Sequence, residues 1–377
     1  MFNNLKPKIL FVTNVDWFFI SHRLAIAQET LSNGFEVIVA AEDTGRSSEI
    51  TEKGIKFIKL SFSRSGTNPF NEFITLIKIY KIYTQIKPDI VHHVTLKPVI
   101  YGSIIAKFLN IRNVVNAISG LGYMFTEGRI NFISKLMIFL IKYSFNNKSS
   151  IIFQNKDDYN ELLNLKILSP KNQIYFIKGS GVNLKEFYPT IFPSFKKINF
   201  VLPSRMLWDK GVKEFYIAAS LLKKNYFDKI RFILVGMVDT NNKSAVPISL
   251  LKEWDDGEYF KWVGHKKDIF EIYKNAHVVV LPSYREGVPR TLIEACAMGR
   301  AIITTEAIGC RECVEAGING LTVPIKDAQS LANAIEFLVN NPERIIDMGI
   351  ASRSKAEAEF DIISVINTHL EIYNQFI

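Results

Sequence analysis

Two glutamates, Glu286 and Glu294, lie close together in the stretch PSYREGVPRTLIEACAMG. Two carboxylates can act as acid and nucleophile in glycoside hydrolysis. They can also hold the hydroxyl groups of a ligand, or form the charged edge of a helix, with Glu286 as a cap and Glu294 at the surface. The residue types alone leave these three alternatives open.

The elements expected around the pair place the two carboxylates differently. AHVVVLP predicts a buried strand, SYREGVP its exit loop, and RTLIEACAMG a helix that ends at Gly299. Gly287 permits a tight turn, and Pro289 suits a first helical turn. Glu286 then lies beside the free amides of the helix start, where a negative charge is favoured. Glu294 lies more than a turn into the helix, so the two share no helical face.

A basic pair follows another expected strand. In PSRMLWDKGVKEF, Arg205 lies at the junction of strand and loop, and Lys210 precedes Gly211 and a helix. An arginine fork, a mobile lysine charge and the amides of a helix start can together hold a diphosphate. A solvated basic loop is the alternative. The glycoside hydrolase alternative gives this basic pair no role. The sequence has no GxxxxGKS motif, which argues against a P-loop, and no GxGxxG after the first strand, which argues against a nicotinamide-binding domain.

Short apolar runs alternate with segments of helical period along the whole chain. This alternation predicts parallel, doubly wound α/β sheets in two halves, which we place at 1–185 and 198–359. The amphipathic segment 360–377 is expected to pack back on the first half. Ligands of such sheets bind at the carboxyl ends of the strands. The expected strands are 8–14, 35–42, 56–62, 88–94, 112–119, 199–206, 230–236, 260–265, 276–283, 301–306 and 320–324.

Composition indicates an ordered cytoplasmic protein of 377 residues with 48% hydrophobic residues. The start resembles no signal peptide, and no apolar run reaches the length of a membrane span. The chain has three cysteines, Cys296, Cys310 and Cys313. This low and odd number argues against a disulfide framework. The CxxC formed by the last two lacks a second ligand pair, so we interpret it as chance.

The net charge of +9 is unevenly distributed. Residues 1–185 hold 23 Lys and Arg against 13 Asp and Glu, whereas 186–377 hold 23 against 24. The first half should therefore meet an anionic partner: nucleic acid, a lipid surface or a phosphorylated substrate. Segments 71–88 and 129–148 mix lysines with apolar residues, which suits helices at a membrane surface or helices that cover the sheet. No nucleic-acid recognition signature is found.

At this point the motifs resemble those of a known family. Glu286 to Glu294 resembles the E-x7-E motif of retaining nucleotide-sugar transferases of glycosyltransferase family 4, which have the GT-B fold of two Rossmann-like domains facing across a cleft. SRMLWDKGVKEF is similar to the R-x4-KG motif of that family. AGINGLTVP and GSGVNLKEFYP resemble its later segments. FSRSGTNPF, TLKPVIYGSIIAK and SGLGYMF resemble bacterial O-antigen and capsule transferases that extend undecaprenyl-diphosphate-linked glycans.

The resemblance implies a role for each matching residue of the second half. Arg205 and Lys210 would hold the donor diphosphate, Glu286 would touch the donor sugar, and Glu294 would bind the ribose. These two basic residues and Glu286 form the implied catalytic set. No metal or other cofactor is implied, because the basic pair supplies the electrostatic stabilisation. The further donor contacts would come from Gly287, Val288, Pro289, Arg290, Thr291 and Leu292 in the loop and helix start, and from Gly264 and His265 against the base.

The first half departs from the family pattern where the acceptor would bind. NVDWFFISHR replaces a Gly-Gly loop, and Ser119 stands where many members carry a histidine. The candidate acceptor contacts are Asp16, His22, His93, Lys97 and Ser119. We expect one of His92 and His93 to face the ligand and the other to pack in the sheet, although a satisfied structural histidine is the commoner case. Lys97, in the loop after that strand, is the better partner for a diphosphate.

These observations predict a metal-independent, retaining glycosyltransferase. It would move an N-acetylhexosamine such as N-acetylgalactosamine, or a hexose, from a UDP-sugar donor to a polyprenyl-diphosphate-linked acceptor saccharide. Its place would be the inner face of the plasma membrane, as a peripheral protein with no nucleic-acid partner. Two alternatives stay open: a non-hydrolysing UDP-sugar 2-epimerase, and a non-catalytic module that binds a membrane surface.

Overall fold

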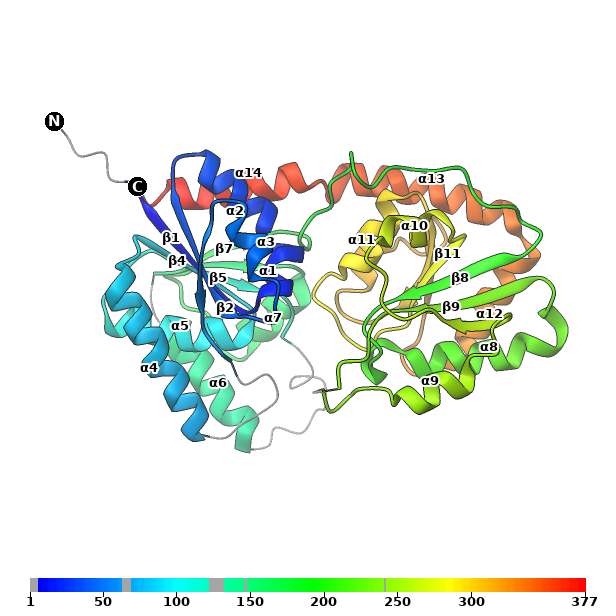
Figure 1. Ribbon diagram of the computed structural model, residues 1–377, viewed down its shortest axis with the longest axis horizontal. Helices are drawn as coiled ribbons and strands as arrows, with labels where there is room; N and C mark the ends of the chain where they lie inside the picture. The colour runs from blue at the N-terminus through cyan, green and yellow to red at the C-terminus, as the bar shows by residue number, and fades with distance from the viewer. Residues whose placement is uncertain (1–5, 63–68, 122–131, 146–147, 241) are drawn as a thin grey trace. The chain divides into compact units, whose positions relative to one another are not determined.

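The computed structural model describes residues 6–62, 69–121, 132–145, 148–240 and 242–377. The chain forms two compact units (Figure 1): a first unit of Met1–Ser180 and Ile362–Ile377, and a second unit of Gly181–Asp361. Segments 62–70, 119–125 and 129–148, which entered the sequence analysis, lie partly outside the described residues.

The first unit is built on a parallel sheet of seven strands in the order β3-β2-β1-β4-β5-β6-β7. The sequence predicts five of them and misses β6 and β7, which are only four residues long. The strands are β1 (Lys8–Val15), β2 (Glu36–Glu42), β3 (Lys56–Lys59), β4 (Ile90–Val94), β5 (Val114–Ile118), β6 (Ser150–Phe153) and β7 (Gln173–Phe176). The helices are α1 (Asp16–His22), α2 (Leu24–Ser32), α3 (Ser47–Thr51), α4 (Pro69–Ile86), α5 (Leu96–Phe108), α6 (Phe132–Phe145), α7 (Lys156–Asn164) and α14 (Ile362–Asn374).

The second unit holds a parallel sheet of six strands in the order β10-β9-β8-β11-β12-β13. Every strand predicted for this half is present. The strands are β8 (Ile198–Pro203), β9 (Ile230–Val235), β10 (Phe260–Trp262), β11 (Val278–Leu281), β12 (Ala301–Thr305) and β13 (Gly320–Val323). The helices are η2 (Trp208–Lys210), α8 (Val212–Tyr226), α9 (Ile248–Trp254), α10 (Ile269–Lys274), α11 (Arg290–Ala297), η3 (Arg311–Cys313), α12 (Ala328–Asn340) and α13 (Pro342–Glu359).

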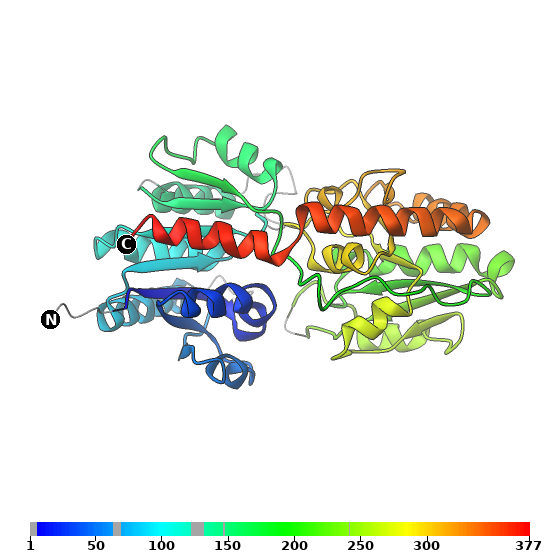
Figure 2. The ribbon, with the colours of Figure 1, turned by 90° about the horizontal axis from the view of Figure 1, so that it is seen from above.

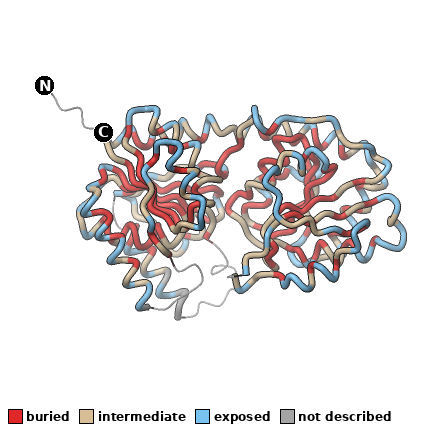
Figure 3. The backbone as a smooth tube through the Cα atoms, in the orientation of Figure 1, coloured by how far each residue is buried: buried red, intermediate tan, exposed pale blue. Residues whose placement is uncertain are grey.

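Helices cover both faces of the first sheet. The side chains of each strand alternate between these two faces. Leu10 and Val12 pack in a core with residues of α4, α5 and α6. Ile9 and Phe11 pack in the opposite core with residues of α2 and α14. Figure 2 shows the red helix α14 lying along this sheet, and Figure 3 shows the strands as the most buried part of the unit. The last helix therefore completes the core of the first unit.

This double cover overturns the expectation that one of two adjacent histidines faces a ligand. His92 and His93 of β4 are both fully buried, one on each face of the sheet. Nδ1 of His92 lies 2.6 Å from the hydroxyl of Tyr373 on α14. Nε2 of His93 lies 2.7 Å from the hydroxyl of Tyr83 on α4. A central parallel strand is buried on both sides, so alternation does not expose either residue.

Each sheet has one point at which the strand order reverses direction. It lies between β1 and β4 in the first unit and between β8 and β11 in the second. Loops that leave the carboxyl ends of these strands diverge and leave room for a ligand. Within the part of the chain that the structure describes, no helix is long and apolar enough to cross a membrane. The three cysteines are buried and free, and the described residues contain no cluster suited to a metal ion.

Candidate functional site

Lys210 and Glu286 meet at the reversal point of the second sheet. Lys210 ends η2, in the loop after β8, and Glu286 lies in the loop after β11. Because β8 and β11 are hydrogen-bonded neighbours, these two loops lie side by side. Nζ of Lys210 forms an ion pair with Oε1 of Glu286. The hydroxyl of Ser283 donates a hydrogen bond of 2.6 Å to the same carboxylate oxygen.

Backbone contacts lock the two loops together around this pair. The carbonyl of Asp209 accepts from the amide of Tyr284 at 2.9 Å and from the hydroxyl of Ser283 at 3.0 Å. The carboxylate of Asp209 accepts from the hydroxyl of Ser244 at 2.6 Å. The sequence did not predict a role for Asp209, Ser244, Ser283 or Tyr284. Polar residues are ordinary in loops, so no local signal marks these four.

Two glycines allow the close approach of the loops. Gly211 has a φ of +72°, and a Cβ atom there would lie 2.1 Å from the carbonyl oxygen of Pro282. Gly309 has a φ of +81°, and its Cβ would lie 2.0 Å from the carbonyl oxygen of Gly287. Glycine tolerates both the left-handed backbone and the missing space. The position of Glu286 therefore depends on a glycine in the loop after β12.

Arg205 lies just beyond β8, as expected. Its Nη1 donates to Oδ2 of Asp239, 3.1 Å away, in the segment after the neighbouring strand β9. The arginine side chain is 39% exposed, so a ligand can reach it. Asp239 lies 34 positions later in the chain, so the sequence around Arg205 does not predict this acidic partner.

Glu294 is buried in α11, so the alternative that placed it at the surface is wrong about its position. Its Oε2 accepts from the hydroxyl of Tyr273 at 2.9 Å, and its Oε1 accepts from Nε of Arg290 at 2.6 Å. Burial raises the pKa of Tyr273 well above its ordinary value, and the negative charge of Glu294 adds to this rise. The carboxylate is thus held in one orientation.

The start of α11 presents fewer amides than expected. The amide of Leu292 donates to the carbonyl of Pro289 at 3.0 Å, so its expected contact with a phosphate competes with an existing bond. The hydroxyl of Thr291 donates to the carbonyl of Pro203 at 2.9 Å, which ties the helix to β8. Val288, in the preceding loop, is buried. The amide of Glu286 is bonded to the carbonyl of Ile308 at 3.0 Å.

Gly264 and His265 follow the edge strand β10. Gly264 has a φ of +65°, and its carbonyl accepts from the amide of Gly236 at 2.8 Å. His265 is exposed. Both residues therefore lie at the carboxyl end of the same sheet as the Lys210–Glu286 pair.

The expected acceptor residues of the first unit are mostly engaged within the protein. Asp16 is fully buried and accepts from the amide of Thr44 at 2.7 Å, its hydroxyl at 2.5 Å and the amide of Arg46 at 3.0 Å. It thereby ties the end of β1 to the loop after β2. Both carboxylate oxygens of Asp16 already accept hydrogen bonds within the protein. Neither is therefore available for the acceptor contact that was expected of this residue.

Lys97 and His93 also have partners within the first unit. Lys97 lies in the first turn of α5 rather than in a loop, and its Nζ is 2.6 Å from Oε1 of Glu72. His93 is bonded through Nδ1 to Oδ1 of Asn116 at 2.8 Å, and burial lowers its pKa to about 4. His22 lies on α1, stacked on Phe18 with ring centroids 4.1 Å apart. His93 is thus enclosed between the sheet and its helices, whereas the acceptor contacts expected of Lys97 and His22 stay predictions.

A set of buried polar atoms instead marks the carboxyl ends of β1, β4 and β5. Oγ1 of Thr13, Oδ1 of Asn14, Oγ1 of Thr95 and Oγ of Ser119 have no hydrogen-bond partner among the described residues. Thr95 also has a φ of +74°, which is strained for a β-branched residue. Ser119 was predicted here, whereas the other three were missed. Their position in the last residues of β1 or just after β4, on either side of the reversal point, is the signal that would have found them.

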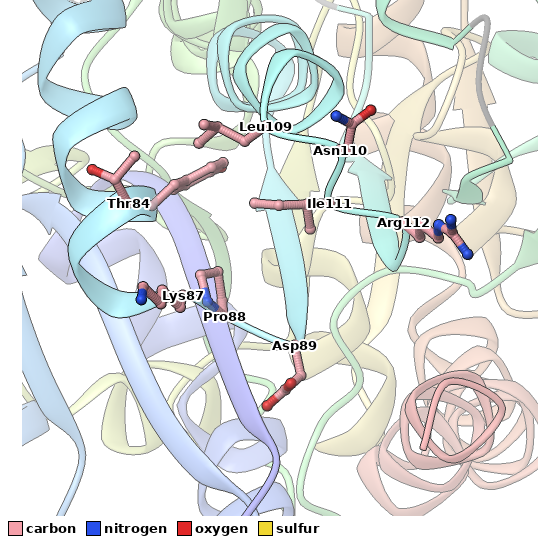
Figure 4. Close-up of a pocket in the computed structure, with 9 residues that line it drawn as sticks. Thr84, Lys87, Pro88, Asp89, Leu109, Asn110, Ile111 and Arg112 are labelled. Atoms are coloured by element: carbon pink, nitrogen blue, oxygen red, sulfur yellow. The ribbon is translucent and has the colours of Figure 1, made fainter.

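A separate hollow of about 510 Å³ lies at the opposite end of the strands of this sheet (Figure 4). Lys87, Asp89, Asn110 and Arg112 line it, where α4 and α5 end and the chain enters β4 and β5. Oδ2 of Asp89 already accepts from the amide of Lys8 at 2.7 Å. The hollow is thus at the amino ends of the strands, away from the orphaned polar atoms.

Comparison with protein families assigns both units. Residues 8–155 match the family Glycosyl transferase 4-like, and residues 185–355 match the family Glycosyl transferases group 1. The two matches follow each other along the chain and fall in the first and the second unit.

Relatives of known activity cover almost the whole chain. An "N,N'-diacetylbacillosaminyl-diphospho-undecaprenol alpha-1,3-N-acetylgalactosaminyltransferase" of Campylobacter jejuni is 29% identical over 370 residues, 94% of this chain and 95% of the relative. A "UDP-Gal:alpha-D-GlcNAc-diphosphoundecaprenol alpha-1,3-galactosyltransferase" of Escherichia coli is 23% identical over 356 residues, 90% of this chain and 89% of the relative.

Solved structures agree on the fold. The sucrose-phosphate synthase of Thermosynechococcus elongatus superimposes with a TM-score of 0.80 at 20% identity over 98% of this chain and 99% of that one. Anabaena HepE, solved in complex with UDP, gives 0.78 at 16% identity over 98% of this chain and 100% of that one. Each doubly wound unit matches one glycosyltransferase family model: the first unit is glycosyl transferase 4-like, and the second belongs to glycosyl transferases group 1. The chain therefore belongs to the GT-B glycosyltransferases.

Proposed function

We propose that the protein transfers a sugar from a UDP-sugar to a saccharide linked to polyprenyl diphosphate, with retention at the anomeric carbon. The observation that carries the donor half of this proposal is the Lys210–Glu286 pair at the reversal point of the second sheet. The acceptor class is supported by the Campylobacter relative, whose name specifies a diphospho-undecaprenol acceptor and N-acetylgalactosamine transfer. The transferred sugar would be an N-acetylhexosamine or a hexose.

Charge neutralisation at the donor diphosphate would come from this chain's own residues. Lys210 has a compact ammonium group with three donors, so it can share them between Glu286 and a phosphate oxygen. Arg205 is partly exposed and can turn one edge of its fork from Asp239 to the diphosphate. The amino end of α11 would add its dipole. On this basis transfer requires no metal ion.

Glu286 already accepts from Lys210 and from the hydroxyl of Ser283, so we assign it to donor-sugar hydroxyls rather than to proton abstraction. The bond between the anomeric carbon and the phosphate oxygen would break as the bond to the acceptor hydroxyl forms on the same face. The hydroxyl proton would pass to the departing phosphate oxygen, so no protein base is required. Glu294, fixed by Tyr273 and Arg290, would accept hydrogen bonds from the ribose.

The acceptor would bind at the carboxyl ends of β1, β4 and β5. Thr13, Asn14, Thr95 and Ser119 offer hydroxyl and amide groups whose buried atoms lack partners among the described residues. Buried polar groups without partners are costly, and a saccharide or a diphosphate can supply the missing hydrogen bonds. A membrane-anchored acceptor would place the protein peripherally on the inner face of the plasma membrane.

The test is a donor screen with lipid-linked acceptors extracted from bacterial membranes. We expect one UDP-sugar to give a product whose mass rises by one sugar residue, with release of UDP and an α linkage by NMR. Chelation with EDTA should leave the rate unchanged. Conversion of the UDP-sugar without any acceptor would support the 2-epimerase, and vesicle binding without any turnover would support a binding module; either result would overturn the proposal.

A further inference from the structure

Three neighbouring helices of the first unit carry exposed apolar side chains on one face. Among the described residues, six of the nine exposed large aromatic side chains belong to α4, α5 and α6. Their most exposed members are Phe70, Phe73, Phe108 and Phe139, with 60–72% of each residue exposed. The full set, which we name the aromatic face, is Phe70, Phe73, Ile77, Tyr80, Phe108, Leu136, Phe139 and Tyr143.

The spacing of these residues makes the face continuous along each helix. On α4 they recur at 70, 73, 77 and 80, and on α6 at 136, 139 and 143, which is the period of one helical stripe. The opposite stripe of each helix is buried, with Ile79 and Tyr83 on α4 and Ile141 and Phe145 on α6. Each helix is therefore apolar on two sides, although only one side is needed to cover the sheet.

The end of α5 joins the two stripes. The ring of Phe108 lies 6.0 Å from that of Tyr80 on α4. The ammonium of Lys107 lies 3.9 Å from the ring centre of Tyr143 on α6. Figure 1 shows α4, α5 and α6 gathered on one side of the first unit. The eight side chains thus form one surface spread over three elements.

Lysines border this surface, and carboxylates are almost absent from it. The three helices hold six lysines: Lys78, Lys81, Lys97, Lys107, Lys135 and Lys142. Their single acidic residue is Glu72, whose carboxylate is 16% exposed and paired with Lys97. Lys81 and Lys142 are exposed, and each lies next to an exposed aromatic residue in sequence, Tyr80 and Tyr143. Exposed aromatic residues next to exposed lysines match an apolar layer under anionic headgroups.

We propose that the aromatic face is the membrane-docking surface of this protein, and that its partner is a bilayer containing anionic phospholipids. The phenylalanines would enter the boundary between headgroups and acyl chains, while the lysine stems lie along it and their ammonium groups reach the phosphates. The proposal rests on the function proposed above, because the acceptor of that reaction is anchored in the same bilayer. A second copy of the chain fits less well, since two such faces would oppose lysines to lysines.

The experiment uses the full chain and flotation with two kinds of vesicle. One kind contains phosphatidylethanolamine with phosphatidylglycerol, and the other contains phosphatidylcholine alone. The test variants are Phe73→Ser with Phe139→Ser, and Lys81→Gln with Lys142→Gln. The matched controls remove exposed large apolar residues or exposed lysines from the second unit: Phe337→Ser with Ile350→Ser, and Lys213→Gln with Lys252→Gln.

We expect the wild type to float with the anionic vesicles and more weakly with the neutral ones. Each test variant should lose at least about tenfold in partition to anionic vesicles, and each control should bind as the wild type does. Thermal midpoints and transfer to a detergent-solubilised acceptor should be unchanged in all four variants. Equal binding of test and control variants would overturn the proposal, as would a wild type that does not float.

The failure of this surface can be distinguished from failure of the proposed reaction. Sugar transfer to the detergent-solubilised acceptor without vesicle binding would refute the docking surface and leave the reaction standing. Vesicle binding lost in both test variants, in a protein that transfers no sugar, would support the surface and refute the reaction. A wild-type dimer that only the phenylalanine variants dissociate, without any effect on flotation, would assign the face to a second copy and overturn the proposal.

Discussion

Lys210 and Glu286, 76 positions apart in the chain, form an ion pair in the second domain. Both side chains are mostly buried, with exposed fractions of 19% and 14%. Oε1 of Glu286 accepts from the Lys210 ammonium and from the hydroxyl of Ser283, so two contacts fix the orientation of this carboxylate. The pair therefore favours a binding role for Glu286 and lets Lys210 respond to the arrival of an anionic diphosphate.

Replacing Lys210 with alanine should lower kcat/KM for the sugar donor by about 100-fold or more, because a charge that stabilises the leaving diphosphate is lost. Steady-state kinetics of UDP release would measure this loss. Lys213→Ala removes an exposed lysine three positions later and should keep full activity. A Lys210→Ala enzyme as active as Lys213→Ala would show that the pair has no part in catalysis.

Replacing Gly309 with alanine should impair activity far more than the same change at Gly317. Both glycines have left-handed backbone, with φ of +81° and +80°, so both variants should lose about 1 kcal/mol of stability from backbone strain. Only at Gly309 would the new Cβ meet a carbonyl, that of Gly287, and displace the loop of Glu286. Urea unfolding and donor kinetics on both variants separate the two effects. Equal activities would argue that the loop tolerates displacement.

Removing the Tyr273 hydroxyl by Tyr273→Phe should raise the KM for the donor several-fold and leave kcat nearly unchanged. The hydroxyl donates to Oε2 of Glu294, so its loss frees a carboxylate expected to bind ribose and costs about 1 kcal/mol of stability. Glu294→Ala should raise the KM further. Isothermal titration with UDP would test the assignment directly, and unchanged UDP affinity in Glu294→Ala would contradict it.

Thr95→Gly should stabilise the protein while weakening acceptor use. The φ of +74° costs a threonine about 1–3 kcal/mol, and glycine adopts this conformation without strain. Because glycine also has greater freedom in the unfolded chain, the net gain should be about 1 kcal/mol. The lost hydroxyl should raise the KM for the lipid-linked acceptor, with donor KM unchanged. A variant that is no more stable than the wild type in thermal unfolding would argue against stored strain.

Stability should fall as the pH drops from 7.5 to 5.0. Burial lowers the pKa of His93 from 6.5 to about 4, and it also lowers the pKa of His369, to about 3. Between these values and 6.5 the unfolded chain binds protons that the folded chain excludes, so the stabilisation is complete above pH 6.5 and is lost as the pH falls. At pH 5.0 His93 alone should account for about 2 kcal/mol.

Urea unfolding at several pH values would measure this slope. His93→Gln can keep a hydrogen bond to Tyr83 but cannot titrate, so its stability should fall less over the same interval. The same slope in the variant and the wild type would show that His93 is protonated in the folded protein.

The local sequence was sufficient to predict the position of a residue where that position depends on its neighbours along the chain. The strand, loop and helix around Glu286 follow from apolar runs, glycine and proline, so its separation from Glu294 could be predicted. The same is true of Arg205 and Lys210 after β8, and of the doubly wound pattern in both units. The strands β6 and β7 escaped prediction because four residues carry too little periodicity.

Tertiary structure alone decided which of the polar residues are available to a ligand. Asp16 is bonded to Thr44 and Arg46 because the loops after neighbouring parallel strands meet at one end of the sheet, whereas Lys97 is paired with Glu72 because α5 lies next to α4. The Lys210–Glu286 contact arises in the same way, from strands β8 and β11 that are adjacent in space but distant in sequence. The sequence determined which residues could do chemistry, whereas the choice of partners depended on strand order, which long-range packing sets.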